Sequence, residues 1–225
     1  MDDTYILNIE TSTKACSVSL NLNGNLISCE DIVGSGFSHS EKLLPFISQT
    51  IENSKIKMSD LSAVAVSMGP GSFTGLRIGV STAKGICYAL GIPLIAVSTL
   101  QAMAFGMAKK IKSELYCPMI DARRMEVYAA FYDLENNLVR KIQADIINES
   151  SYLDFLVKEV VFFGDGSLKI QEIIKHKKAT FVSDFHPSAK FIGDLSYEKF
   201  RNSEFVDIAY FEPYYLKDFV GGKKA

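Results

Sequence analysis

The sequence predicts an α/β protein made of two halves that share one order of elements. A short apolar strand that ends in an acidic residue occurs twice, at Glu10 and at Asp121. A Gly-x-Gly-Ser turn also follows an apolar strand twice, at Gly69 and at Gly164. The chain has 225 residues, 48% hydrophobic and 22% charged, which is enough for one large domain or two of roughly 110 residues. This recurrence favours a duplicated fold, with chance similarity of short strands as the alternative.

The first predicted elements are a strand and a β-hairpin. Residues 5–9 form a short apolar run that leads into Glu10. Residues 16–22 alternate small or polar with apolar side chains, and an Asn-Gly-Asn turn at residues 23–25 leads into residues 26–31. This pattern is typical of two antiparallel strands joined by a tight turn.

A helix is predicted over residues 39–53. The segment Ser38-His39-Ser40-Glu41 has the S-x-x-E form of a capping box, which marks a helix N-terminus. Apolar residues then recur at helical spacing, namely Leu43, Leu44, Ile47 and Ile51.

A strand, a glycine-rich turn and a second helix follow. Residues 63–68 (AVAVSM) form a compact apolar strand that runs into the turn GPGSFTG at residues 69–75. Residues 76–90 have the pattern of a helix, which ends at Gly91 and cannot continue past Pro93.

Another strand at residues 94–98 and a helix after it complete the first half, which spans residues 1–108. The boundary is expected near residues 109–113, and the second half spans residues 109–220. The tail at residues 221–225 (GGKKA) is expected to be disordered.

The second half repeats this plan. An apolar strand ends at Asp121, and a hairpin joins residues 126–133 to residues 138–142. A strand at residues 160–163 leads into the turn GDGS, after which residues 168–176 are predicted to be helical.

Charge and cysteine content exclude several classes of protein. Lys and Arg number 24 against 26 Asp and Glu, so the chain lacks the positive excess of a protein that holds RNA by itself. The four cysteines form no Cys-x-x-Cys pair and the N-terminus has no signal-peptide pattern, which indicates reduced thiols in the cytoplasm. Residues 85–108 carry no charge, but Gly91 and Pro93 interrupt them, so we expect no membrane span.

The glycine-rich turns have two interpretations. A strand, a glycine turn and a helix N-terminus can cradle a phosphate, although Leu76-Arg77 stands where a Walker loop has Lys-Ser/Thr. The same glycines can instead serve close packing of the turn and helix. The strand-end acids can organise a metal–water shell or simply end their strands. The candidate vestigial phosphate-binding residues are Glu10, Ser12, Gly69, Gly71, Ser72, Asp121, Gly164 and Gly166.

No catalytic or metal-binding constellation is recognisable. His39, His176 and His186 lie far apart, with no H-E-x-x-H motif and no cysteine at metal-ligand spacing. We interpret His39, in the first turn of a helix, as a packing or partner-contact residue rather than a base.

A stripe of small residues marks the helix after the first glycine turn. Gly75, Gly79, Ala83 and Cys87 recur every four residues and allow close approach of another element, which can be the sheet beneath or the helix of a partner. We predict a partner interface on the two helices of the first half, and expect a bulky charge at Gly79 or Ala83 to weaken association by several kcal/mol while the monomer stays folded. The predicted interface residues are His39, Leu43, Ile47, Gly75, Leu76, Gly79, Val80, Ala83 and Cys87.

Five strings occur in order along the chain: ILNIETSTKACSVSL, HSEKLLP, SMGPGSFTGLRIGVSTAKGICYALGIPLIAVSTLQAMA, IDARRMEVYAAFYD and EPYYLKD. They resemble the TsaB (YeaZ) family, densely over residues 5–108 and sparsely afterwards. The string GPGSFTGLRIG followed by G-I-P and V-S is highly specific. The resemblance implies the duplicated actin/hexokinase-like (ASKHA, ribonuclease H-like) two-domain α/β fold, in agreement with the repeat.

The resemblance also implies a catalytic partner. The family's paralogue TsaD transfers a threonylcarbamoyl group from threonylcarbamoyl-AMP to an adenosine next to the anticodon of ANN-decoding tRNAs, using a metal held by a His-x-x-x-His pair. In this chain the similar segment starts at Thr99 and ends at Met103, whose hydroxyl and thioether are poor substitutes for two imidazoles. Glu10 stands where many relatives carry Asp.

We therefore expect a non-catalytic scaffold or dimerisation subunit with no cofactor or metal of its own. ATP and a metal are expected on the partner subunits. The expected partners are TsaD, the small ATPase subunit TsaE through the complex, a second copy of the chain when it is alone, and tRNA only through the complex. The isolated chain is then expected neither to bind tRNA tightly nor to hydrolyse ATP.

Two other functions are weighed against this one. GPGSFTG, GDGS, Glu10 and Asp121 are compatible with a small-molecule kinase or ATPase of the same fold, which requires micromolar ATP binding and turnover by the isolated chain. A metalloprotease requires stoichiometric zinc or iron, for which three scattered histidines are a poor ligand set.

Overall fold

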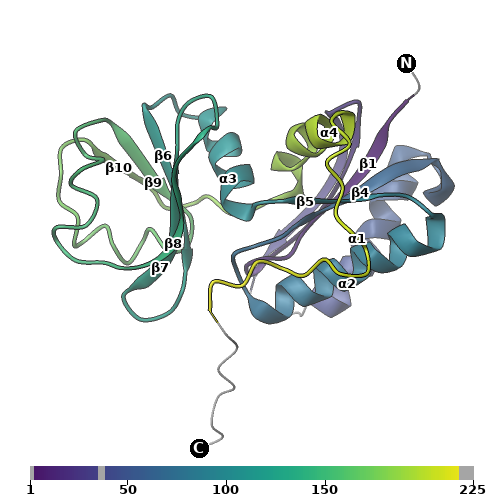
Figure 1. The fold of residues 1–225 in the computed structure, drawn as a ribbon, viewed down its shortest axis with the longest axis horizontal. Helices are drawn as coiled ribbons and strands as arrows, with labels where there is room; N and C mark the ends of the chain where they lie inside the picture. Colours follow the sequence, from purple (N-terminus) through teal and green to yellow (C-terminus); the bar gives the residue numbers. More distant parts are fainter. Residues whose placement is uncertain (1–2, 35–38, 218–225) are drawn as a thin grey trace, which may run out of the picture.

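A computed structural model describes residues 3–34 and 39–217. The chain forms two five-stranded mixed sheets that lie side by side, each with its own hydrophobic core (Figure 1). The predicted α/β architecture is confirmed.

The first sheet has the strand order β3-β2-β1-β4-β5. Strands β1, β2 and β3 are antiparallel neighbours, whereas β4 runs parallel to β1 and to β5. The bounds are β1 Tyr5–Glu10, β2 Ala15–Leu22, β3 Asn25–Val33, β4 Leu61–Ser67 and β5 Leu94–Val97.

The second sheet has the order β8-β7-β6-β9-β10, which is the same order shifted by five strands. Its first three strands are again antiparallel and the remaining pairs are again parallel. The predicted internal repeat is therefore present in the strand topology itself. The bounds are β6 Leu115–Asp121, β7 Glu126–Tyr132, β8 Leu138–Ile146, β9 Val160–Phe163 and β10 Ala179–Val182.

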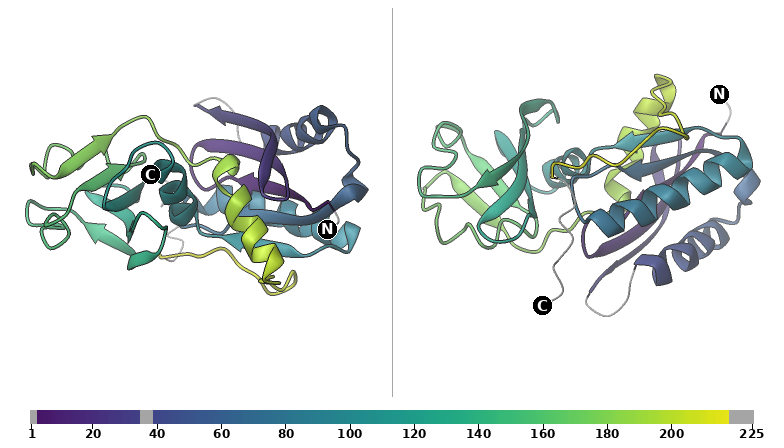
Figure 2. Two further views of the ribbon diagram at one scale, coloured as in Figure 1. Left: turned by 90° about the horizontal axis from the view of Figure 1, so that it is seen from above. Right: turned by 60° about the horizontal axis from the view of Figure 1, so that its bottom comes forward.

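Helices cover both faces of the first sheet. Helices α1 (His39–Ser54) and α2 (Phe73–Leu90) lie next to each other on one face, as Figure 2 shows, and pack into a core with β1, β2 and β4. Helix α4 (Gly193–Arg201) packs on the opposite face against β1 and β5. Short 3-10 turns occur at Met58–Asp60 and Ala189–Phe191.

The second half lacks the helices that correspond to α1 and α2. Residues 149–157 and 165–173 are successive turns, so the predicted helix at residues 168–176 is wrong. The backbone hydrogen bonds here alternate between three- and four-residue spacing. A nine-residue segment with β-branched Ile170, Ile173 and Ile174 is below the length at which a helix sustains itself.

The chain crosses between the halves more than once. Helix α3 (Thr99–Ala108), which follows β5, packs into the second half against β6 and β7. Residues 206–217 return along the first sheet, where Val206 bridges β5, and run beside α2 to the second half (Figure 1). The boundary after residue 108 stays a prediction, and the predicted tail at residues 221–225 lies outside the described residues, as does Ser38 of the capping box.

Among the described residues, every helix is too short or too polar to cross a membrane.

Candidate functional site

The GPGSFTG turn packs tightly against the loop between β1 and β2. The Ser72 amide donates to the carbonyl oxygen of Ser12 at 2.6 Å. A Cβ atom at Gly71 would lie 2.2 Å from that same oxygen, and one at Gly75 would lie 2.2 Å from the Thr11 carbonyl oxygen. Only glycine fits at both positions, so the two segments are held in direct backbone contact.

This packing occupies donors that a phosphate would need. The Ser72 amide is used as described above, and the Gly75 amide donates to Ser72 Oγ at 3.3 Å, which caps α2. A free nest of backbone amides is the basis of phosphate binding at such turns. The packing interpretation of the glycines accounts for these contacts, while a phosphate-binding role stays a prediction.

Glu10 faces the interior. Its side chain is buried, and Oε1 accepts hydrogen bonds from the Ser12 amide at 2.6 Å and from Ser67 Oγ at 3.0 Å. Burial raises the pKa of this carboxyl above its usual value of 4.5. Glu10 therefore braces the turn after β1, and its carboxylate has no path to a metal–water shell in the solvent.

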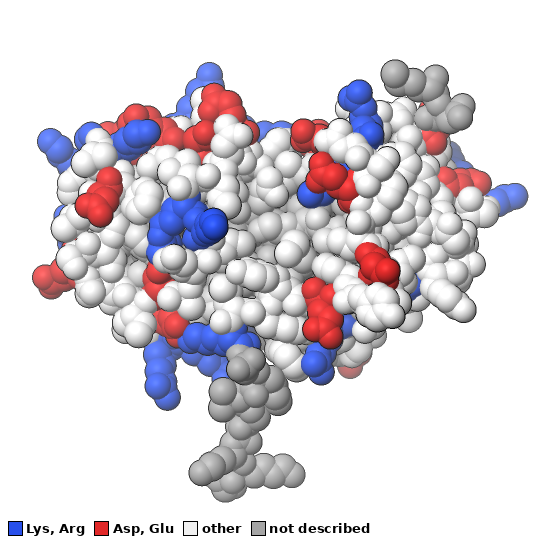
Figure 3. Space-filling model, in the orientation of Figure 1, with Lys and Arg blue, Asp and Glu red and all other residues white. Residues whose placement is uncertain are grey.

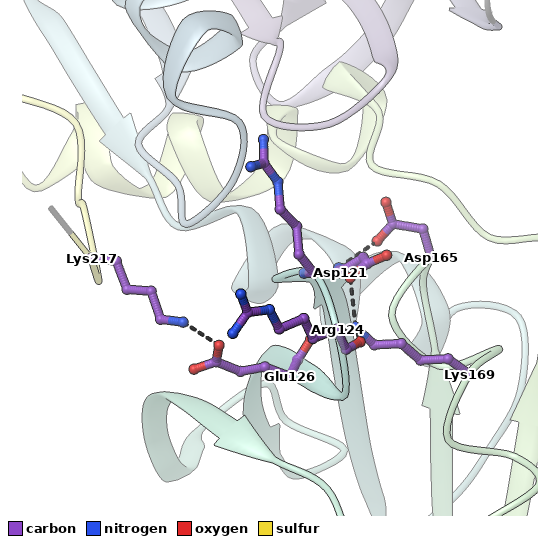
Figure 4. Close-up of polar contacts among 7 residues, drawn as sticks. Asp121, Arg124, Glu126, Asp165, Lys169 and Lys217 are labelled. Carbon is purple, nitrogen blue, oxygen red and sulfur yellow. Dashed lines mark hydrogen bonds and ion pairs between the residues drawn. The ribbon is translucent and has the colours of Figure 1, made fainter. Parts of the chain in front are cut away.

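Asp121, the counterpart of Glu10, is half-exposed and is paired with an ammonium group. Its Oδ1 accepts from the Arg123 amide at 2.7 Å and from Lys169 Nζ at 2.6 Å. Lys169 Nζ also donates to the carbonyl oxygens of Arg124 at 2.8 Å and Glu126 at 2.5 Å (Figure 4). All three N–H groups of Lys169 are thus satisfied, and a protein cation occupies the place where a metal would neutralise this acid.

The GDGS turn repeats the close packing of the first half. A Cβ atom at Gly164 would lie 2.2 Å from the Met119 carbonyl oxygen, and one at Gly166 would lie 3.0 Å from the Ile120 carbonyl carbon. Asp165 Oδ1 accepts from the Asp121 amide at 2.9 Å, and burial raises the Asp165 pKa. Neither of the two surface hollows found in the described residues, one beside Asp31 and one beside Arg140, includes any of the candidate phosphate residues.

The predicted interface residues on α1 and α2 need revision. A Cβ atom at Gly79 would lie 2.2 Å from Thr11 Oγ1, so the small stripe faces the chain's own loop and sheet. His39 is only partly buried, and its Nε2 lies 3.1 Å from the Ala15 carbonyl oxygen. Buried inside the folded chain are Leu43, Ile47, Gly75, Leu76, Gly79, Val80, Ala83 and Cys87. These side chains are out of a partner's reach, and a charge at Gly79 or Ala83 would disrupt the monomer, contrary to expectation.

The outward face of the same helices carries a second set of small and apolar residues. Ser81, Gly85 and Ala89 recur every four residues and are exposed, and a Cβ atom at Gly85 would meet nothing within 4 Å. Leu44 is 62% exposed and Tyr88 is 84% exposed on this pair of helices. The sequence contained this signal, since the four-residue spacing of small side chains occurs twice in α2, but spacing alone does not tell which stripe faces outward.

The described residues contain no group of three or more His, Cys, Asp or Glu side chains that could hold a metal ion. Thr99 and Met103 are buried in the core that α3 forms with the second sheet. Cys16, Cys29, Cys87 and Cys117 are free thiols.

Comparison with known proteins agrees with this geometry. Residues 36–212 match the family model of TsaD, described as tRNA N6-adenosine threonylcarbamoyltransferase. The chain is 30% identical over 228 residues to the tRNA threonylcarbamoyladenosine biosynthesis protein TsaB of Escherichia coli strain K12, covering 97% of each protein.

Solved structures show the same fold. YeaZ from Pseudomonas aeruginosa superposes with a TM-score of 0.81 at 26% identity, over 95% of this chain and all of that chain. The activator of the 2-hydroxyisocaproyl-CoA dehydratase from Clostridium difficile, solved with bound ADPNP, gives a TM-score of 0.50 at 12% identity, over 90% of this chain and 97% of that one. The second likeness shows the fold alone. Together with the repeated strand order, these neighbours confirm the expected duplicated actin/hexokinase-like fold.

Proposed function

This chain belongs to the TsaB family of tRNA threonylcarbamoyladenosine biosynthesis proteins, and from that premise we propose that it acts as a non-catalytic scaffold. In this proposal it docks on a TsaD-type subunit, which transfers the threonylcarbamoyl group to the adenosine next to the anticodon of ANN-decoding tRNAs. The ATPase subunit and the tRNA join through the complex. The proposal places the assembly in the cytoplasm, which the four free thiols support.

The observation that carries the proposal is the environment of Thr99 and Met103. They occupy the segment that resembles the metal-binding histidine pair of the catalytic paralogue, and both are buried in an apolar core. A hydroxyl and a thioether that pack among Leu100, Met107 and Phe163 are part of the folded interior rather than ligands.

The outward face of α1 and α2 supports a docking role. It exposes Leu44 and Tyr88 beside the small stripe Ser81, Gly85 and Ala89, which would let another helix approach closely. The partner we propose is the TsaD-type subunit rather than a second copy of this chain. Because this chain itself matches the TsaD family model, a TsaD-type protein has an equivalent helix pair with which to form a pseudo-symmetric contact.

Reconstitution tests the proposal. Threonylcarbamoyl transfer to an ANN-decoding tRNA should require this chain together with the TsaD-type and ATPase subunits of the same organism, and should fail when the chain is omitted. The isolated chain should show neither ATP turnover nor transfer. Full activity without the chain would refute the scaffold role, and micromolar binding and hydrolysis of ATP by the chain alone would support the kinase or ATPase alternative.

A further inference from the structure

The loop between β6 and β7 carries two adjacent arginines, Arg123 and Arg124, and we propose that it binds a phosphate group of RNA bound to the assembly. Both residues are exposed, and neither guanidinium makes a hydrogen bond or ion pair with any described residue. Two planar guanidinium groups side by side suit the bidentate hydrogen bonding of a phosphate.

The acids around the loop are already neutralised. Asp121 pairs with Lys169 at 2.6 Å, and Glu126 pairs with Lys217, which reaches it from the C-terminal segment (Figure 4). The two guanidinium charges therefore remain as a local positive surplus on a protein whose formal net charge is −2. In Figure 3, Lys and Arg atoms also gather along the lower edge of the second half, where the described part of the C-terminal segment ends in Figure 1.

The loop backbone is fixed before any ligand arrives. Arg123 and Arg124 both have left-handed backbones, with φ of 71° and 50°. The Asp121 carboxylate holds the Arg123 amide, and the Lys169 ammonium holds the Arg124 carbonyl oxygen at 2.8 Å. A ligand that binds the arginines therefore needs to order only their side chains, which lowers the entropic cost of binding.

Aromatic residues beside the loop favour RNA over a free phosphate compound. Lys217 anchors the C-terminal segment to Glu126, and Tyr214, which is 39% exposed, lies three residues before it. Tyr215 stacks on Phe73 with a centroid distance of 4.8 Å. Basic side chains next to exposed aromatic rings are typical of surfaces that contact single-stranded RNA.

This inference rests on the proposed function, because the chain alone lacks the charge to hold RNA and the rest of the assembly must supply most of the affinity. The test compares wild-type assembly with an assembly carrying Arg123→Ala and Arg124→Ala. The matched control carries Lys141→Ala and Arg201→Ala, which remove two exposed cations elsewhere. Melting of each variant checks that it is folded.

Affinity for an unmodified ANN-decoding tRNA is measured over a range of salt concentrations. We expect the arginine variant to bind about tenfold more weakly and to lower the slope of log affinity against log salt by about 1, the value for one lost phosphate contact. The Arg123→Lys, Arg124→Lys variant should recover the salt slope but only part of the affinity, because lysine keeps the charge without the planar fork. The control should match wild type.

A second arm identifies the source of the phosphate. Inorganic phosphate and ADP are titrated into the isolated chain, and binding that disappears in the arginine variant would assign the loop to a free phosphate compound instead of RNA. Unchanged tRNA affinity and salt slope in an intact assembly, with no phosphate or ADP binding, would overturn the inference, as would an equal loss in the control. Loss of subunit association in the arginine variant would also overturn it, by assigning the loop to a protein contact. If the wild-type chain fails to form an assembly, the proposed function fails, while the titration still tests the loop.

Discussion

The two halves of the molecule share a sheet and differ in what the sheet supports. In the first half, the acid at the end of β1 is buried, and the glycine turn leads into an 18-residue helix that presents a small and apolar outward face. In the second half, the acid at the end of β6 is half-exposed and pairs with Lys169, and the glycine turn leads into a series of turns. One duplicated frame thus holds a docking helix on one side and a charged hairpin on the other. The comparison teaches that strand order is preserved while the loop side chains decide the use of each half.

The largest effect should come from the two glycines of α2 that lie on opposite faces of the helix. Gly79→Glu places a bulky charge where a Cβ atom would already lie 2.2 Å from Thr11 Oγ1, and should reduce the free energy of unfolding by more than about 4 kcal/mol. Gly85→Glu meets no atom within 4 Å, and should change the free energy of unfolding by less than about 1 kcal/mol. Urea unfolding measures both. Equal losses in the two variants would show that the inward and outward faces are assigned incorrectly.

A smaller effect is expected where the second half uses a lysine as its internal cation. Lys169→Met leaves the Asp121 carboxylate and two carbonyl oxygens without their shared donor, and should cost about 2 kcal/mol of unfolding free energy. Lys175→Met is the matched control, since Lys175 pairs only with exposed Glu172 on the surface. A loss in Lys169→Met no larger than in the control would mean that this cluster does not hold the hairpin.

The C-terminal segment that joins the halves should contribute less. Tyr215 stacks on Phe73, and its hydroxyl accepts from Arg77 Nε at 3.3 Å, so Tyr215→Ala should cost about 1 kcal/mol. Tyr210 is 85% exposed, and Tyr210→Ala should leave thermal unfolding unchanged. If the two variants melt alike, the segment does not clamp the N-terminus of α2.

The smallest change, a carboxyl to an amide, separates the two halves by pH. Burial raises the pKa of Glu10 above 4.5, so the unfolded chain releases this proton at lower pH than the folded chain. The stability contributed by the protonated group is complete below pH 4.5 and is lost as pH rises through the folded pKa. Glu10→Gln should therefore lose less unfolding free energy than wild type between pH 4.5 and neutrality. Asp165→Asn in the second half should act in the same direction but more weakly, because Asp165 is only partly buried. Parallel pH profiles for Glu10→Gln and wild type would contradict this assignment.

Local signals account for the parts of the fold that the sequence predicted. The Asn-Gly turn after β2, the apolar run of β4 and the glycine that ends α2 are each encoded within a few residues, so strands, hairpin and helices of the first half follow from the pattern. The helix expected after GDGS failed for a local reason as well, since its isoleucines fit either a helix or packed turns.

Long-range contacts account for what the sequence did not predict. The return of α4 and residues 206–217 to the first sheet joins positions far apart in the chain, as does the contact of Lys169 with Asp121. The stripe at Gly75 and Gly79 correctly indicated close approach, but the approaching element is the Thr11 loop of the same chain. Periodicity identifies a stripe and leaves its neighbour undetermined.

Affinity of the isolated chain for the TsaD-type subunit of the same organism tests the central claim most directly. Gly85→Glu should weaken association at least about a hundredfold, equivalent to about 2.7 kcal/mol, because it places an unpaired charge at the centre of a close helix contact, whereas Gly85→Ala should bind close to wild type. Wild-type affinity in the folded Gly85→Glu variant would contradict the assignment of the outward face of α1 and α2 as the docking surface.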